Sequence, residues 1–189
     1  MRPRNGCLTV AFITSVIALT GGCAKHDGQH GTDTGAETPS AAPRPSPTAT
    51  PTWHGKEDQE KAMRNATRAL NATESEGAQR VDEGVNSLSQ GLNKTFTAKD
   101  RPHTFDIACQ APGPRSITLT LTRGTAQSEW DVTCGDREAD QFNIPAGSTF
   151  TAHVPAAGTA IDGLVLWRFN AVDSANVDGC DDEIKGCED

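Results

Sequence analysis

The sequence predicts an α+β fold in which an amphipathic helix, or a pair of helices, precedes a small antiparallel β-sandwich. Two patterns carry this prediction. Apolar residues are three or four positions apart between residues 56 and 98, which is the period of a helix, and two positions apart after Pro102, which is the period of a strand. Turn-forming Gly and Pro residues separate the alternating runs, and no helix-length segment lies between them. Parallel β–α–β units are therefore not expected.

Residues 56–98 are predicted to be helical, because they contain no Pro and are rich in Ala, Glu, Lys, Asn and Gln. Residues 56–73 carry a weak apolar stripe of Met63, Ala66 and Leu70. From residue 78 onward the stripe is sharper, with steps of three or four between Ala78, Val81, Val85, Leu88, Leu92 and Phe96. One continuous helix and two helices broken near residues 75–77 both remain open.

Three glycines recur every seven residues in the second half of this segment, at Gly77, Gly84 and Gly91. A Gly inside a helix costs about 0.5–1 kcal/mol relative to Ala. Either the glycines let the helix approach another surface closely, or the helix is weakly stable and the spacing is accidental. The sequence does not decide between these interpretations.

Residues 101–172 are predicted to form a β-sandwich of the jelly-roll or Ig-like kind. Six short runs alternate between apolar and polar residues, at the spacing typical of such folds. The alternation places Trp130 and Trp167 on faces that point into the core. It places His153 on the face opposite Phe150 and Val154, so His153 is expected to be exposed to solvent.

Four cysteines are predicted to form two structural disulfides. Cys109 and Cys134 end two of the alternating runs on their inward faces, and Cys180 and Cys187 are close together in a polar segment. Four Cys allow three pairings; we favour Cys109 with Cys134 and Cys180 with Cys187. Small exported domains often depend on such bridges.

Residues 1–22 have the features of a secretory signal peptide. Arg2 and Arg4 supply a positive start, and the uncharged run from Leu8 to Leu19 is shorter than the roughly 20 residues that span a bilayer. Small residues, Gly21 and Gly22, follow this run.

The stretch Leu19-Thr20-Gly21-Gly22-Cys23 resembles the lipobox of bacterial lipoprotein precursors. The resemblance implies cleavage after Gly22 and attachment of fatty acyl chains such as palmitate through the thiol of Cys23. It also implies a location at the extracytoplasmic face of the cell membrane. The pattern departs from the family at Thr20, where Leu, Val or Ile is preferred.

Cysteine parity favours this interpretation over an ordinary secretory signal with a free thiol at Cys23. Once Cys7 is removed with the signal, five cysteines remain, and an odd cysteine in an exported protein needs an explanation. Residues 23–55 then form the lipidated cysteine and a disordered Pro/Thr/Gly-rich tether, whose Pro-rich part extends by about 3.1 Å per residue.

Residues 173–189 are predicted to be an acidic tail closed by a disulfide. Their carboxylates are expected to be solvated, although a converging turn could present them to Ca²⁺. The segment lacks the spaced ligands of an EF-hand loop, so no metal site and no cofactor are assigned.

Composition narrows the range of partners and activities. A net charge of −8 on 189 residues argues against nucleic acid as a partner. Neither a G-x-S-x-G elbow nor a phosphate-binding loop occurs, and no catalytic residue is assigned. Aromatic rings commonly form platforms for sugars, and with no Tyr in the chain these would be Trp53, Trp130 and Trp167.

The sequence therefore favours a membrane-anchored surface lipoprotein that acts as a non-catalytic binding module for an envelope protein or glycan. An envelope-associated hydrolase, or an accessory glycan-binding domain of one, is the alternative. A carboxylate pair or a buried His in a cleft would favour the hydrolase.

Overall fold

The computed structural model describes residues 51–177 and 179–186. In this part of the chain one helix, α1 (Lys56–Thr73), precedes eight strands and a short 3-10 helix, η1 (Ser174–Asn176). The strands, in chain order, are β1 (Gln79–Ser87), β2 (Leu92–Thr97), β3 (His103–Gln110), β4 (Ser116–Arg123), β5 (Ala126–Thr133), β6 (Asp140–Ile144), β7 (Thr149–Val154) and β8 (Leu164–Ala171).

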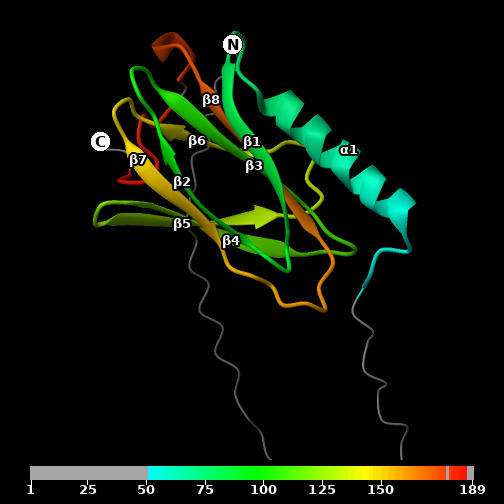
Figure 1. The fold of residues 1–189 in the computed structure, drawn as a ribbon. Coiled ribbons are helices and arrows are strands. Elements are labelled where there is room, and N and C mark those ends of the chain that lie inside the picture. Colours follow the sequence, from blue (N-terminus) through cyan, green and yellow to red (C-terminus); the bar gives the residue numbers. More distant parts are fainter. Residues whose placement is uncertain (1–50, 178, 187–189) are drawn as a thin grey trace, which may run out of the picture. The chain divides into compact units, whose positions relative to one another are not determined.

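The strands form two four-stranded sheets, in the orders β1-β8-β3-β6 and β2-β7-β4-β5, and every pairing is antiparallel. Helix α1 lies along the outer side of the sheet that contains β1, β8 and β3 (Figure 1). The described part is therefore a mostly β domain with two antiparallel sheets and one helix, as predicted.

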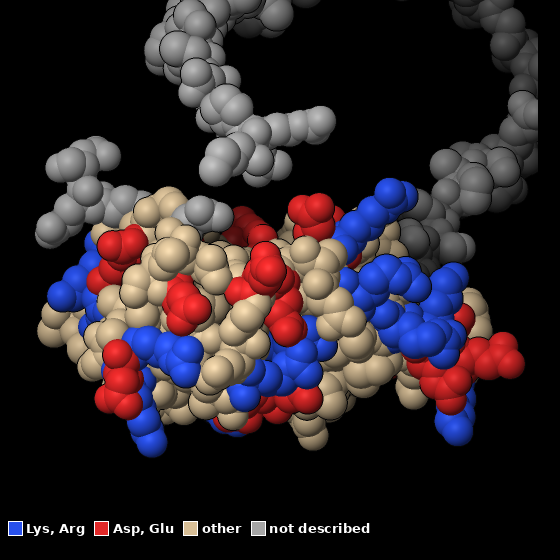
Figure 2. All heavy atoms as spheres, turned by 90° about the horizontal axis from the view of Figure 1, so that it is seen from above, with Lys and Arg blue, Asp and Glu red and all other residues tan. Residues whose placement is uncertain are grey.

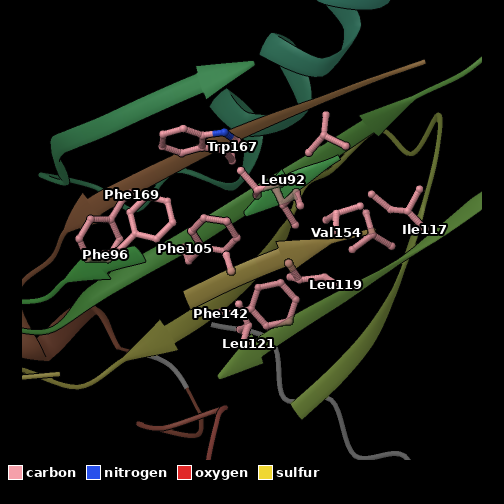
Figure 3. Packing of buried hydrophobic residues seen from close by; sticks show 14 of the residues in the cluster. Leu92, Phe96, Phe105, Ile117, Leu119, Leu121, Phe142, Val154, Trp167 and Phe169 are labelled. Carbon is pink, nitrogen blue, oxygen red and sulfur yellow. The ribbon is translucent and has the colours of Figure 1, made fainter. Parts of the chain in front are cut away.

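Apolar side chains from both sheets fill the space between them. Figure 3 shows the rings of Phe96, Phe105 and Phe169 grouped together, with Trp167 beside them. Phe96 on β2 lies at the centre of this group, with ring centroids 5.2–5.3 Å from four other aromatic rings. Burial of these large side chains is the main source of stability for the fold.

A second, smaller apolar cluster joins α1 to the outer face of β3 and β8. The helix contributes three alanines and Leu70, and the strands contribute Ala108, Leu164 and Leu166. Because β3 and β8 are covered by α1 on one face and by the other sheet on the opposite face, every residue in both strands is buried. Such strands are typical of a sheet covered on both sides.

The prediction of helix throughout residues 56–98 is wrong for its second half. Only residues 56–73 are helical, and the sharper apolar stripe belongs to β1 and β2. Val81 and Val85 are 56% and 53% exposed, so they are not part of a buried stripe. The inward positions of β1 hold Asp82, Gly84 and Asn86, so a period of two does not appear in its hydrophobic residues.

The regular glycine spacing also has a strand-and-turn explanation. Gly77 and Gly91 have φ angles of 72° and 67°, a left-handed conformation that suits turns at which helices and strands end. A Cβ added to Gly84 would lie 2.4 Å from Cζ2 of Trp167, so this glycine admits the indole ring. The close approach is therefore present, but between a strand and a core Trp.

The six strands predicted in residues 101–172 are confirmed as β3 to β8. Trp167 is buried and His153 is exposed, as expected. Trp130 was expected in the core, yet it is 39% exposed, because β5 is the edge strand of its sheet. One side of its ring packs against Phe142, with 5.3 Å between centroids.

The acidic C-terminal segment is not simply solvated, in contrast to the prediction. Ile184 is 2% exposed and belongs to the core between the sheets. The carboxylate of Asp182 pairs with the guanidinium of Arg123, and its other oxygen accepts hydrogen bonds from the backbone N–H groups of Ile184 and Lys185. Burial raises the pKa of Glu183. The segment thus packs on the domain through its one large apolar side chain.

Candidate functional site

The disulfide between Cys109 and Cys134 is confirmed. Cys109 lies in β3 of the first sheet, and Cys134 directly follows β5 of the second, so the bridge ties the two sheets together. Both cysteines are buried in the core, and backbone hydrogen bonds from Cys134 to Arg115 and from Gly135 to Cys109 hold the site. A disulfide enclosed in this way has a structural role.

The other predicted site cysteines fall partly outside the described residues. Cys180 is disulfide-bonded. Its predicted partner, Cys187, and the predicted lipidation site, Cys23, both lie outside the described residues.

A buried polar group lies beneath the C-terminal end of α1 and centres on Asp106, which has no exposed surface. Asn170 donates to one carboxylate oxygen (2.7 Å), and Gln141 donates to the other (3.0 Å). The Gln141 amide also donates to the backbone oxygen of Thr73 at the end of α1 (3.3 Å). Burial raises the pKa of Asp106 to about 6, while the hydrogen bonds from Gln141 and Asn170 lower it.

This shift makes stability depend on pH in a defined direction. Folding favours the protonated form of Asp106, so ionisation is penalised as pH rises from about 4 to about 6, and the penalty is complete above that range. We expect the wild type to lose about 2 kcal/mol through this group between pH 4 and pH 7. Asp106→Asn should remove that loss, because the introduced amide has no charge.

Urea unfolding between pH 4 and pH 7 measures this effect as the difference in free energy of unfolding between Asp106→Asn and the wild type. The control is Glu129→Gln, which removes an exposed carboxylate on β5 and should give a curve parallel to the wild type. A parallel curve for Asp106→Asn would show that ionisation of Asp106 does not limit stability.

One hollow, of about 470 Å³, lies between α1 and the edge strand β1. Its surface includes Met63 and Val85. Its charged groups pair with one another, since Glu83 lies 3.3 Å from Nη1 of Arg80 and 3.5 Å from Nε of Arg168. Arg168 donates from Nη1 to Asn71 (2.7 Å) and to Glu74 (2.8 Å). The principal polar groups of this hollow therefore already have partners within the protein.

A larger hollow, of about 560 Å³, lies where the chain enters α1, and we call it the Trp53 groove. Its walls come from three places: the segment before the helix, one face of the first turns of α1, and the end of β3 with the turn after it. The lining residues are Pro51, Thr52, Trp53, His54, Asp58, Lys61, Ala62, Asn65, Gln110, Ala111, Pro112 and Gly113.

Local contacts hold the wall of the Trp53 groove in place. The backbone N–H of Trp53 donates to the carboxylate of Asp162 (3.0 Å), and that of His54 donates to Asp58 (2.9 Å). Trp53 packs against the apolar cluster beneath α1. Gly113 has a φ of 88°, and a Cβ there would lie 3.2 Å from Pro51, so a glycine suits the opposite wall.

The polar groups of this groove differ from those of the first hollow, because several have no partner in the described part of the chain. Gln110 is only 8% exposed, yet no described residue forms a hydrogen bond with its amide. The same holds for the indole N–H of Trp53 and for the ammonium group of Lys61. Among the described residues, the fully buried side-chain atoms without a hydrogen-bond partner are Thr104 Oγ1, Arg168 Nε and Asn170 Oδ1. The amide of Gln110 is not one of them, so it keeps contact with solvent and can be reached from the groove.

No group of three or more His, Cys, Asp and Glu side chains in residues 51–177 and 179–186 is placed to hold a metal ion. Over the same residues, no helix has the length and apolar character needed to cross a bilayer.

Comparison with known proteins does not assign a family. No protein-family model matches the sequence, and no curated protein matches it significantly.

Proposed function

We propose that the chain is a lipid-anchored binding module of the cell envelope, attached through Cys23 and exposed on the extracytoplasmic side of the membrane. The lipobox-like stretch before Cys23 supports the anchor, and the Pro-rich composition that follows supports a tether. The internal disulfide between Cys109 and Cys134 supports folding in an oxidising compartment.

The observation that carries the binding role is the Trp53 groove. It combines an aromatic ring, two side-chain amides and two oppositely charged groups in one concave surface. Pockets that bind small ligands are typically built in this way, with a few polar groups among apolar walls. Residues 51–54, the last part of the predicted tether that lies in the described residues, are held by hydrogen bonds and form one wall of the groove, so the prediction of disorder is wrong for them.

We also infer that the two sheets form a jelly-roll sandwich. Their strand orders, β1-β8-β3-β6 and β2-β7-β4-β5, are those produced when a long antiparallel hairpin is rolled into two facing sheets. Jelly rolls occur in lectin domains among others, but the fold alone does not assign a function. The case for binding therefore depends on the groove.

Site-specific photo-crosslinking tests the binding role in the full chain, in cells that process lipoproteins. A crosslinking residue replaces Lys61, which is exposed at the groove, and the matched control replaces Glu129, which is exposed on β5. We expect a reproducible adduct from position 61, absent from position 129 and lost when Gln110→Leu is added. No adduct from position 61, or the same adduct from both positions, would refute the binding role of the groove.

A further inference from the structure

We propose that the Trp53 groove binds a neutral saccharide. This inference rests on the proposed function, because it names the class of ligand for the same groove. It follows from three features of the groove: an amide without a partner, an aromatic ring held in place, and charges that balance.

The amide of Gln110 is the first feature. Gln110 ends β3, and the alternation along that strand places it on the same face as Asp106 and Ala108, which α1 covers. Most of the residue is buried, but it lines the groove, and its amide keeps contact with solvent and has no partner among the described residues. An amide offers both a donor and an acceptor, which matches a sugar hydroxyl or an N-acetyl group.

Trp53 is the second feature. Its backbone is fixed by the hydrogen bond to Asp162 and its ring by the cluster beneath α1, so the indole is held before a ligand arrives. The apolar C–H face of a pyranose ring packs well on an aromatic face. The indole N–H, which no described residue accepts, adds a donor for a ring or hydroxyl oxygen.

The charges are the third feature. Asp58 and Lys61 lie on the same face of α1 and are opposite in sign, so the groove presents no strong net charge to an ion. Asn65 adds a second amide one turn further along. A neutral ligand with many hydroxyl groups therefore fits the Trp53 groove better than a phosphate, a carboxylate or a cation. On the face of the molecule drawn in Figure 2, blue and red side chains are interspersed with uncharged surface.

The size of the groove agrees with this class of ligand. Its volume of about 560 Å³ lies within the range of about 300–1,000 Å³ found for small-molecule sites.

The test is an NMR titration of the full chain, purified in a detergent whose headgroup is not a sugar. The probes are the N-acetylglucosamine trimer and cellotriose, with trigalacturonic acid as the charged comparison. We expect at least one neutral trisaccharide to shift the indole N–H of Trp53 and the side-chain amide of Gln110 in a saturable way. The indole N–H of Trp130, which donates to Ser128, is the internal control and should not move.

Two variants separate ligand contacts from folding. Gln110→Leu keeps the side-chain volume and removes the amide, and we expect it to weaken binding about tenfold. Trp53→Ala should weaken binding at least about tenfold, although it also removes a contact with the cluster beneath α1. Trp130→Ala should leave the affinity unchanged.

Several results would overturn the saccharide assignment. The first is the absence of a saturable response to either neutral trisaccharide up to about 10 mM, which is a limit for weak binding. The second is equal or tighter binding of trigalacturonic acid. The third is an unchanged affinity in Gln110→Leu. If crosslinking from position 61 still gives a specific adduct and that adduct is a protein, the binding role stands and the saccharide assignment fails. If crosslinking also fails, both proposals fail.

Discussion

Replacing Phe96 by Ala should lower the free energy of unfolding by about 3–5 kcal/mol, the loss typical of a fully packed Phe. Phe96 is 4% exposed and contacts four aromatic rings from both sheets. The truncation leaves a cavity at the centre of this group. The disulfide and the surrounding rings fix the distance between the two sheets. The sheets therefore cannot move together far enough to close the cavity completely. Urea unfolding, followed by tryptophan fluorescence, measures the loss of free energy of unfolding.

Phe142→Ala is the matched control for this prediction. Phe142 is equally buried, at 3% exposed, but its one aromatic neighbour in the described residues is Trp130, at the open edge of the second sheet. Trp130 is partly exposed and has room to move toward the vacated space. We expect Phe142→Ala to cost clearly less than Phe96→Ala. Equal losses would show that the aromatic group around Phe96 has no special role in stability.

Removing the disulfide should be the second large effect. The bridge between Cys109 and Cys134 closes a loop with a sequence separation of 25, for which the loss of chain entropy in the unfolded state corresponds to about 3–4 kcal/mol. Replacing both cysteines by Ala avoids an unpaired buried thiol. We expect the double variant to unfold at a lower urea concentration than the oxidised wild type.

For the comparison, the wild type and the double variant are both unfolded in the presence of a reductant, which also breaks the disulfide of Cys180. Under these conditions the two should have similar midpoints. Peptide mapping of the oxidised wild type should recover Cys109 joined to Cys134. A double variant as stable as the oxidised wild type, or Cys109 joined to a cysteine of the C-terminal segment, would contradict the structural role assigned to this bridge.

The sequence patterns predicted the part of the fold in which hydrophobic alternation is simple. Strands β3 to β8 place apolar residues on their inward faces at every second position. The first two strands were missed for a physical reason. At the edge of its sheet, β1 covers the indole of Trp167 with Gly84 and hydrogen-bonds it through Asn86 (3.1 Å). Its two valines, Val81 and Val85, are exposed and four positions apart, which is a spacing also found in helices.

The C-terminal segment and the groove show what local patterns cannot reveal. Ile184 is a single apolar residue among carboxylates, and only the tertiary structure shows that it enters the core. Trp53 could be named from the sequence as a candidate ring, but Gln110 could not. Its amide becomes part of a groove only because α1 packs across β3, which brings residues 53–65 beside residues 110–113. Contacts between residues so far apart in the sequence are determined by tertiary packing and cannot be inferred from local residue spacing.

Attachment of the protein to a membrane depends on Cys23, and the intact mass of the chain isolated from membranes tests it. We expect a chain that begins at Cys23 and carries the mass of a diacylglyceryl group, with or without a further acyl chain. Cys23→Ser should abolish both this mass and the recovery of the protein with membranes. A membrane-free chain with an unmodified thiol at Cys23, or one cleaved elsewhere and carrying no lipid, would contradict the claim.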